Sequence, residues 1–230
     1  MVSALNGQSG ETKAGAQQDG NGRRAATTGD RGDDRENDPG RADDLAKAVA
    51  AATRAGKGPP PVHLWNPPYC GDLDIRIARN GQWWYLGTPI GRKELVRLFS
   101  SVLKLEDGRY YLVTPVEKIG ITVEDAPFLA VDFRVEAPGP DQVLVFETSV
   151  GDETAAGPEN PIRVARDAET GEPSPYVHVR RGLEALIDRK SFYRLVEIGE
   201  HRAGEDGERW FGLASGGRFF PIIPSVEMEV

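Results

Sequence analysis

The sequence predicts an α+β protein built from two related β-rich lobes, each with the order strand, strand, short helix, strand, strand (ββαββ). Short alternating apolar and polar segments separated by turn dipeptides such as Asn80-Gly81 fill the chain after residue 62, which is typical of antiparallel hairpins. Two short amphipathic segments at helical spacing interrupt these strands. Residues 75–79 (Ile-Arg-Ile-Ala-Arg) and 162–166 (Ile-Arg-Val-Ala-Arg) nearly repeat each other, which indicates an internal duplication.

The first 58 residues have the composition of a low-complexity tail. Their nine acidic and nine basic side chains cancel, and the first aromatic residue of the chain is Trp65. Such a segment buries too little apolar surface to offset the entropy cost of ordering it, so we expect residues 1–58 to be disordered. Apolar side chains at helical spacing from Leu45 to Ala52 predict a short helix at 43–55 that docks weakly on the domain.

The N-terminal lobe is expected over residues 59–150. Its helix is predicted by Leu95, Leu98, Phe99 and Val102, which recur at helical spacing. The strands expected around this helix are 75–79, 83–86, 110–114, 129–135 and 144–150. The dipeptides Asn80-Gly81 and Asp107-Gly108 supply the hairpin turns between the first strands.

The C-terminal lobe is expected over residues 151–230. At a constant offset of 88 residues, Leu183, Leu186 and Ile187 match Leu95, Leu98 and Phe99 of the first lobe, which predicts a second helix at 183–187. The strands expected in this lobe are 162–166, 176–179, 192–198, 209–213 and the segment after 217. Because strands flank Ser215-Gly216-Gly217, this glycine-rich segment is interpreted as a hairpin turn rather than a phosphate-binding loop.

Charge and cysteine usage exclude several classes of function. The net charge of −8 falls entirely on residues 59–230, so the domain lacks the basic field that binding to duplex nucleic acid requires. No apolar run approaches the roughly 20 residues of a membrane helix. Cys70 is the only cysteine, which excludes an intrachain disulfide and suits a reducing compartment. We therefore expect a cytoplasmic protein that binds neither membranes nor duplex nucleic acid.

Three segments, residues 64–79, 84–92 and 109–118, resemble a bacterial protein family known as domain of unknown function 1285. The first of them, from Leu64-Trp65-Asn66-Pro67-Pro68-Tyr69-Cys70-Gly71 to Arg79, is long enough to be specific, and the resemblance extends over about residues 62–230. It implies an α+β fold of two related lobes, the second similar to a pleckstrin-homology barrel. It also implies ligand binding between the lobes and a role in signal transduction, and it assigns no catalytic residue.

Basic residues at the expected helix starts are the candidate ligand-binding residues. Arg92 and Lys93 precede the first expected helix, and at the same offset of 88 residues Arg180 and Arg181 precede the second. The positive end of a helix dipole favours anions, so bases there are destabilising unless a negative group lies nearby. Such a conflict, found twice, is typical of functional sites.

Arg76 and Arg163 form a further equivalent pair on the repeated strand. We therefore expect six residues to line an anion-binding crevice between the lobes: Arg76, Arg92, Lys93, Arg163, Arg180 and Arg181. The alternative, that each base forms an ion pair with a carboxylate of the acidic domain, stays open.

Other groups carry weaker hypotheses. Asp72 and Asp74 lie two apart on an expected strand, so their carboxylates share a face and could hold a divalent metal; the alternative is a solvated strand face compensated by Arg76. Cys70 is expected to be a small buried side chain. His63, His178 and His201 show none of the spacings of a zinc site or of a cysteine–histidine pair. We expect no metal, no cofactor and no catalytic residue.

The function predicted from these observations is a non-catalytic regulatory module that binds a small anionic or nucleotide-like ligand. One alternative is an adaptor that binds another protein through sheet edges or the tail. A second alternative is a metal-dependent hydrolase that uses Asp72 and Asp74.

Overall fold

The computed structural model describes residues 40–53, 59–204 and 207–228. Apart from residues 40–53, the predicted disordered tail lies outside the described residues. The helices in the described part are α1 (Arg41–Thr53), α2 (Lys93–Ser101) and α3 (Arg189–Glu197), with short 3₁₀ turns η1 (Val62–Leu64) and η2 (Ser225–Met228). None of the described helices has the length and apolar character needed to cross a membrane.

Helix α1 occupies almost the segment in which the sequence predicts a helix. Asp43 and Asp44 lie in its first turn, where negative charge interacts favourably with the helix dipole. Leu45 and Val49, one turn apart, are 2% and 0% exposed. The helix therefore contributes directly to the hydrophobic core.

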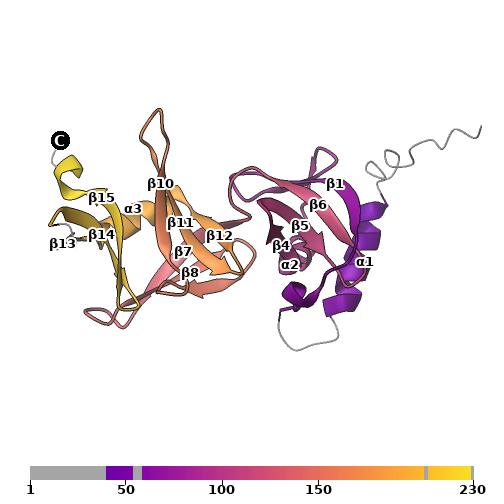
Figure 1. The fold of residues 1–230 in the computed structure, drawn as a ribbon, viewed down its shortest axis with the longest axis horizontal. Helices are drawn as coiled ribbons and strands as arrows, with labels where there is room; N and C mark the ends of the chain where they lie inside the picture. Colours follow the sequence, from indigo (N-terminus) through magenta and orange to yellow (C-terminus); the bar gives the residue numbers. More distant parts are fainter. Residues whose placement is uncertain (1–39, 54–58, 205–206, 229–230) are drawn as a thin grey trace, which may run out of the picture. The chain divides into compact units, whose positions relative to one another are not determined.

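The first lobe contains one six-stranded sheet in the order β3-β2-β1-β6-β5-β4, of which β1, β6, β5 and β4 are labelled in Figure 1. Its strands are β1 (Tyr69–Ile77), β2 (Trp83–Tyr85), β3 (Thr88–Pro89), β4 (Leu103–Glu106), β5 (Arg109–Val113) and β6 (Lys118–Val123). Two antiparallel three-stranded meanders join through β1 and β6, which pair in parallel. Helix α2 packs on this lobe through Phe99, whose ring stacks on that of Trp83 with centroids 6.4 Å apart.

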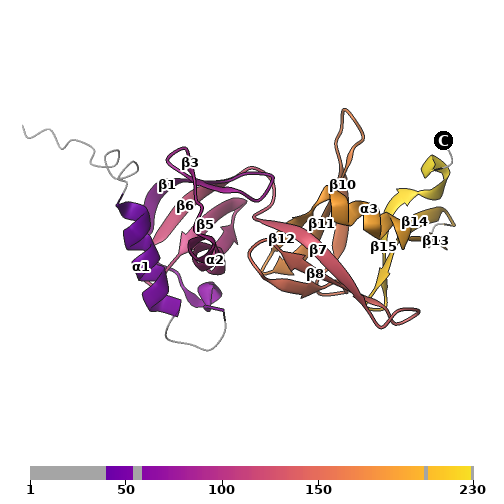
Figure 2. The same cartoon turned by 180° about the vertical axis from the view of Figure 1, so that it is seen from behind.

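The second lobe contains a six-stranded sheet in the order β10-β11-β12-β7-β8-β9 and a three-stranded sheet in the order β13-β14-β15 (Figures 1 and 2). The strands of the larger sheet are β7 (Phe128–Glu136), β8 (Val143–Thr148), β9 (Glu153–Ala155), β10 (Ile162–Arg166), β11 (Pro173–Arg180) and β12 (Leu183–Ile187). The smaller sheet consists of β13 (Glu200–Ala203), β14 (Arg209–Ser215) and β15 (Arg218–Pro224). Again one parallel pair, β12 with β7, joins two antiparallel meanders.

These sheets confirm the predicted α+β fold of two β-rich lobes. All the described strand pairs are antiparallel except β1–β6 and β12–β7, as the sequential hairpins predict. The expected lobe boundary at residue 150 differs from the sheet boundary, because β7, β8 and β9 pair with the strands that follow them. The sheets divide between Val123, where β6 ends, and Phe128, where β7 begins.

The prediction of a second helix at 183–187 is wrong. Residues 183–187 form the central strand β12, and the helix α3 occupies most of the segment 192–198 that was expected to be a strand. In β12, Leu183, Ala185 and Ile187 are almost fully buried; this spacing of two residues suits a strand. The order strand, strand, helix, strand, strand does recur, but in the second lobe these strands belong to two different sheets.

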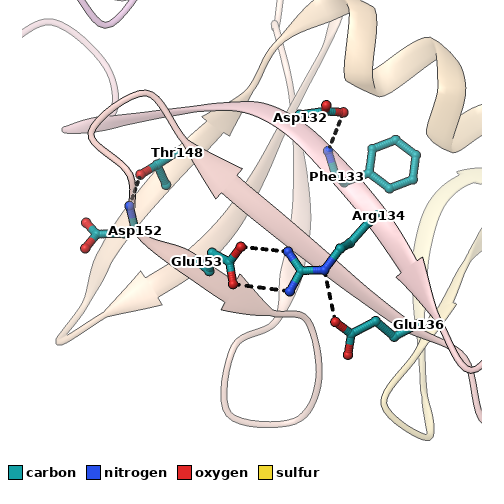
Figure 3. Close-up of polar contacts among 7 residues, drawn as sticks. All are labelled: Asp132, Phe133, Arg134, Glu136, Thr148, Asp152 and Glu153. Carbon is teal, nitrogen blue, oxygen red and sulfur yellow. Dashed lines mark hydrogen bonds and ion pairs between the residues drawn. The ribbon is translucent and has the colours of Figure 1, made fainter.

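Ion pairs link strands on the surface of the second lobe, and Figure 3 shows one such cluster. Arg134 on β7 donates from Nη1 and Nη2 to both carboxylate oxygens of Glu153 on β9, at 2.7 and 3.2 Å. Its Nε donates to Glu136 at 3.0 Å. Because β8 lies between β7 and β9, the guanidinium reaches across β8 to join β7 and β9. The hydrogen bonds from Arg134 lower the pKa of the Glu153 carboxyl below its ordinary range.

Replacing Arg134 with glutamine should raise the pKa of Glu153 toward its ordinary value of 4.5. A carboxyl whose pKa is lowered by folding stabilises the folded state above its unfolded pKa, and this contribution is lost as the pH falls through the folded value. The test is an NMR titration of the Glu153 carboxyl carbon in the wild type and in Arg134→Gln. Identical midpoints would contradict the role assigned to this ion pair.

Close packing in the small sheet requires glycine at position 212. A Cβ there would lie 2.3 Å from the carbonyl oxygen of Phe220 and 2.7 Å from the ring of Phe219. Gly212→Ala should therefore lower the free energy of unfolding by about 1–3 kcal/mol, the usual cost of overpacking. Urea denaturation measures the loss. Gly91→Ala is the matched control, because no atom lies within 4 Å of its added Cβ; equal losses in the two variants would disprove the packing argument.

Candidate ligand-binding site

A pocket of about 650 Å³ lies at the start of α3, a volume within the range of small-molecule sites. Its apolar wall consists of Leu129, Pro173, Pro175, Leu186, Ile187 and Phe192. Its polar lining consists of Arg79, Asn80, Glu172, Ser174, Asp188, Arg189 and Tyr193. The pocket thus combines an apolar surface with two guanidinium groups.

The chain enters α3 directly from the central strand β12. Asp188 is the N-cap residue, and its carboxylate accepts a hydrogen bond of 2.7 Å from the backbone N–H of Ser191. The backbone N–H of Asp188 donates to the carbonyl of Ala130 on β7, which fixes the start of the helix against the sheet. The first turn carries Arg189 and Lys190 and no acidic residue. Two cations therefore follow the cap at the helix end that favours anions.

Arg189 lies in the pocket beside an aromatic ring. Its Nε donates to the hydroxyl oxygen of Tyr193 at 3.1 Å, and its guanidinium carbon lies 5.7 Å from the centre of that ring. The hydrogen bond to Tyr193, together with the nearby charge of Glu172, raises the pKa of Arg189. Tyr193 is 56% exposed, so both its ring and the attached guanidinium are accessible to a ligand.

Arg79 supplies the second guanidinium, from the turn between β1 and β2. Its Nη2 donates to the hydroxyl of Ser174 at 2.7 Å, and its Nε lies 3.4 Å from a carboxylate oxygen of Asp125. The other oxygen of Asp125 accepts a hydrogen bond of 2.7 Å from Tyr176. Burial, and then this hydrogen bond, raise the pKa of the Tyr176 hydroxyl. Arg79 therefore has a defined place between the pocket and the segment that connects β6 to β7.

Four of the six predicted ligand-binding residues form ion pairs within the protein. Their carboxylate partners are Glu124 for Arg76, Asp43 for Arg92, Glu184 for Arg163 and Asp152 for Arg180. The Arg163–Glu184 contact is bidentate, with distances of 2.7 and 2.5 Å. Ion pairs of this kind are what the alternative interpretation of the basic residues predicts. That these residues also bind a ligand stays a prediction.

Arg180 and Arg181 do not precede a helix, because they lie at the turn between β11 and β12. Arg180 donates to the carbonyl of Ser100 at 3.0 Å, and Arg181 to the carbonyl of Pro60 at 3.1 Å. The second basic helix start is instead Arg189-Lys190. Lys93, the first residue of α2, lines a separate hollow of about 160 Å³ with Arg97.

Asp72 and Asp74 both lie on β1, but the carboxylate of Asp72 is engaged by other groups. It accepts a hydrogen bond of 2.8 Å from Tyr69 and one of 2.9 Å from Arg109, a different arginine from the expected Arg76. Within the described part of the chain, no three His, Cys, Asp or Glu side chains come together as a metal site would require. The expectation that Cys70 is buried is wrong, since its side chain is exposed.

No pattern in the sequence marks Arg79, Phe192, Arg189 or Tyr193 as site residues. In the sequence, Arg79 is the last residue of the repeated strand, and Phe192 lies in a segment whose pattern predicts a strand. The sequence does contain a signal for α3: aspartate at 188 followed by apolar residues at 192, 195 and 196, which is typical of a capped helix. That signal identifies a basic helix start at Arg189, and the structure places its side chain in the pocket.

Comparison with known proteins places these features in a family. A model described as the N-terminal domain of DUF1285, a domain of unknown function, matches residues 60–126. A model described as the C-terminal domain of DUF1285, a protein of unknown function, matches residues 127–222. The division between the two models falls in the segment that connects β6 to β7. No curated protein matches the chain.

Two solved structures are similar to the chain. The crystal structure of a DUF1285 family protein from Silicibacter pomeroyi DSS-3 at 2.50 Å resolution shares 61% sequence identity and covers 79% of this chain and 98% of that chain, with a TM-score of 0.71. A DUF1285 family protein from Shewanella baltica OS155, solved at 1.40 Å, shares 34% identity over 54% of this chain and 90% of that chain, with a TM-score of 0.42. The two matched models and the identity to the first structure show that the chain belongs to the DUF1285 family.

Proposed function

We propose that the protein is a non-catalytic, cytoplasmic regulatory module that binds a small organic anion in the pocket at the start of α3. The observation that carries this proposal is the pairing of two guanidinium groups, from Arg79 and Arg189, with an apolar wall in one pocket of about 650 Å³. Guanidinium groups favour carboxylates and phosphates because they donate parallel hydrogen bonds.

The lining also indicates the chemical structure to which the anionic group of the ligand should be attached. Phe192, Leu129 and two prolines offer apolar contact, and Tyr193 offers an exposed ring. A flat ring system that bears a carboxylate or phosphate, as in nucleotides, suits such a wall. Glu172 lies within electrostatic range of Arg189 and favours a ligand that also has a hydrogen-bond donor.

The composition of the pocket supports binding rather than catalysis. Among the described residues that line it there is no histidine, the side chain that most often acts as a general base, and no cysteine or lysine that could act as a nucleophile. The carboxylate of Asp188 caps the helix, and the hydroxyl of Ser174 accepts a hydrogen bond from Arg79. These two groups are therefore engaged within the protein, which supports a binding role for the pocket over a catalytic one.

A thermal-shift panel of nucleotides and aromatic carboxylates tests the proposal. A ligand at 100 times its dissociation constant adds about 2.7 kcal/mol of stability, which corresponds to a rise in Tm of roughly 5 °C or more for a domain of this size. Arg189→Gln should weaken binding of the active compound about tenfold or more, the cost of losing a charged hydrogen bond. Arg218→Gln, an exposed arginine at the β14–β15 turn, is the matched control.

The proposal fails if no compound of the panel shifts Tm. It also fails if the two arginine variants weaken binding of the active compound equally, because the anion then does not bind at the pocket.

A further inference from the structure

A small hollow, separate from the pocket at α3, has a volume of about 160 Å³. Helix α2 lines it with Lys93, Val96 and Arg97, and the turn that joins β8 to β9 lines it with Ser149 and Val150. The rest of its described lining comes from the β1–β2 turn and the segment after it: Gly81, Gln82, Trp83 and Ile90. Pockets that hold whole organic ligands measure roughly 300–1,000 Å³. This hollow therefore has room only for a small ion or a single charged group.

Lys93 and Arg97 differ from the other basic side chains of the first lobe because they lack a carboxylate partner. In the segment 59–126, which the structure describes throughout, the other six lysine and arginine side chains each form an ion pair: Arg76, Arg79, Arg92, Lys104, Arg109 and Lys118. With the described residues, neither Lys93 nor Arg97 forms an ion pair or a side-chain hydrogen bond. No acidic residue belongs to the described lining of the hollow. The hollow therefore contains two positive charges that no described carboxylate neutralises.

The positions of these two charges on α2 are unfavourable in the absence of an anion. Lys93 and Arg97 are four residues apart in the helix, so their side chains lie on the same side, one turn apart. Like charges at this spacing repel each other and destabilise a helix. Lys93 is also the first residue of α2, where the helix dipole disfavours a cation. A bound anion would relieve both effects.

The guanidinium of Arg97 has a defined place against the β8–β9 turn. Its Nη2, Cζ and Nε lie 3.2, 3.4 and 3.5 Å from the point that a Cβ of residue 151 would occupy. Residue 151 is a glycine with a φ of 85°, a conformation that favours glycine, so this space is free for the guanidinium. Two residues earlier in the same turn, the hydroxyl of Ser149 has no hydrogen-bond partner among the described residues. The turn thus brings a positioned guanidinium and a hydroxyl donor to one hollow.

We propose that this hollow binds a phosphate group, either as inorganic phosphate or as the terminal group of a phosphate monoester. The ammonium of Lys93, the guanidinium of Arg97 and the hydroxyl of Ser149 hold its oxygens. A phosphate monoester carries a charge of about −1.5 to −2 near pH 7, which matches two cations, and charged N–H donors form strong hydrogen bonds to its oxygens. The site does not depend on the function proposed for the pocket at α3, because the two share no residue of their described linings.

The surroundings of the hollow favour this ligand over other anions. A carboxylate or a chloride ion carries a single charge and would leave one cation uncompensated. A polyanion such as a nucleic acid would be repelled by the acidic domain, which carries the whole net charge of −8.

Calorimetric titration of the full chain with inorganic phosphate, at constant ionic strength in a phosphate-free buffer, tests the proposal. Phosphate should bind at one saturable site, at least tenfold more tightly than acetate. Lys93→Gln and Arg97→Gln should each weaken binding at least tenfold, because each removes a charged hydrogen bond. Both side chains are exposed, so the variants should keep the fold, which circular dichroism checks. Arg218→Gln is the matched control, since it removes the same charge outside the hollow.

Methyl phosphate identifies the source of the phosphate group. An affinity close to that of inorganic phosphate would assign the site to a phosphate monoester, whereas a much lower affinity would assign it to free phosphate.

Absence of saturable phosphate binding, equal affinities for phosphate and acetate, or equal weakening by Arg97→Gln and Arg218→Gln would each overturn the proposal. Phosphate binding that Arg189→Gln abolishes and Lys93→Gln leaves intact would place the anion in the pocket at α3 and would also overturn it.

Discussion

The two large sheets of this protein are joined by the short connection between β6 and β7. Each of these strands belongs to the central parallel pair of its own sheet, β6 with β1 and β7 with β12. Glu124 in the connection accepts hydrogen bonds from the side chain of Arg76 and from the backbone N–H of Arg79. Asp125 binds Arg79 and the hydroxyl of Tyr176. The two carboxylates thus tie the end of β1 to β11. Arg79, which contacts both carboxylates of the connection, also lines the proposed ligand pocket. The pocket and the connection therefore share one side chain.

Much of the fold could be predicted because local signals and tertiary structure agree. Asn80-Gly81 lies at the turn between β1 and β2, and α2 begins within two residues of Leu95. The second helix could not be placed in the same way, because a run such as Leu183 to Ile187 fits a short helix as well as a buried strand. The fixed offset of 88 residues from the first helix then also predicted, wrongly, that Arg180 and Arg181 precede a helix. Parallel pairing depends on contacts between segments that are distant in sequence, and no local pattern reports it.

The candidate site was only partly accessible to sequence reasoning, for an electrostatic reason. The sequence shows where bases lie along the chain but not which carboxylates face them. In the described structure most of the singled-out arginines face an acid, and Arg163 and Arg180 also lie over the rings of Tyr176 and Phe128. A basic helix start does occur in the second lobe, at Arg189 in α3, where the proposed ligand pocket lies.

The turn between β11 and β12 has a consequence for how this family can diverge. Arg180 and Arg181 donate to the main-chain carbonyls of Ser100 and Pro60, groups that every residue type possesses. Natural variation can therefore replace the accepting residues without loss of these bonds, whereas the donors have no substitute of equal reach and geometry. Arg181 has a φ of 52° and Gly182, which follows it, a φ of 77°. These positive φ angles further restrict the residue types that the turn can accept. As far as these two hydrogen bonds are concerned, the turn should tolerate fewer substitutions than the positions of Ser100 and Pro60.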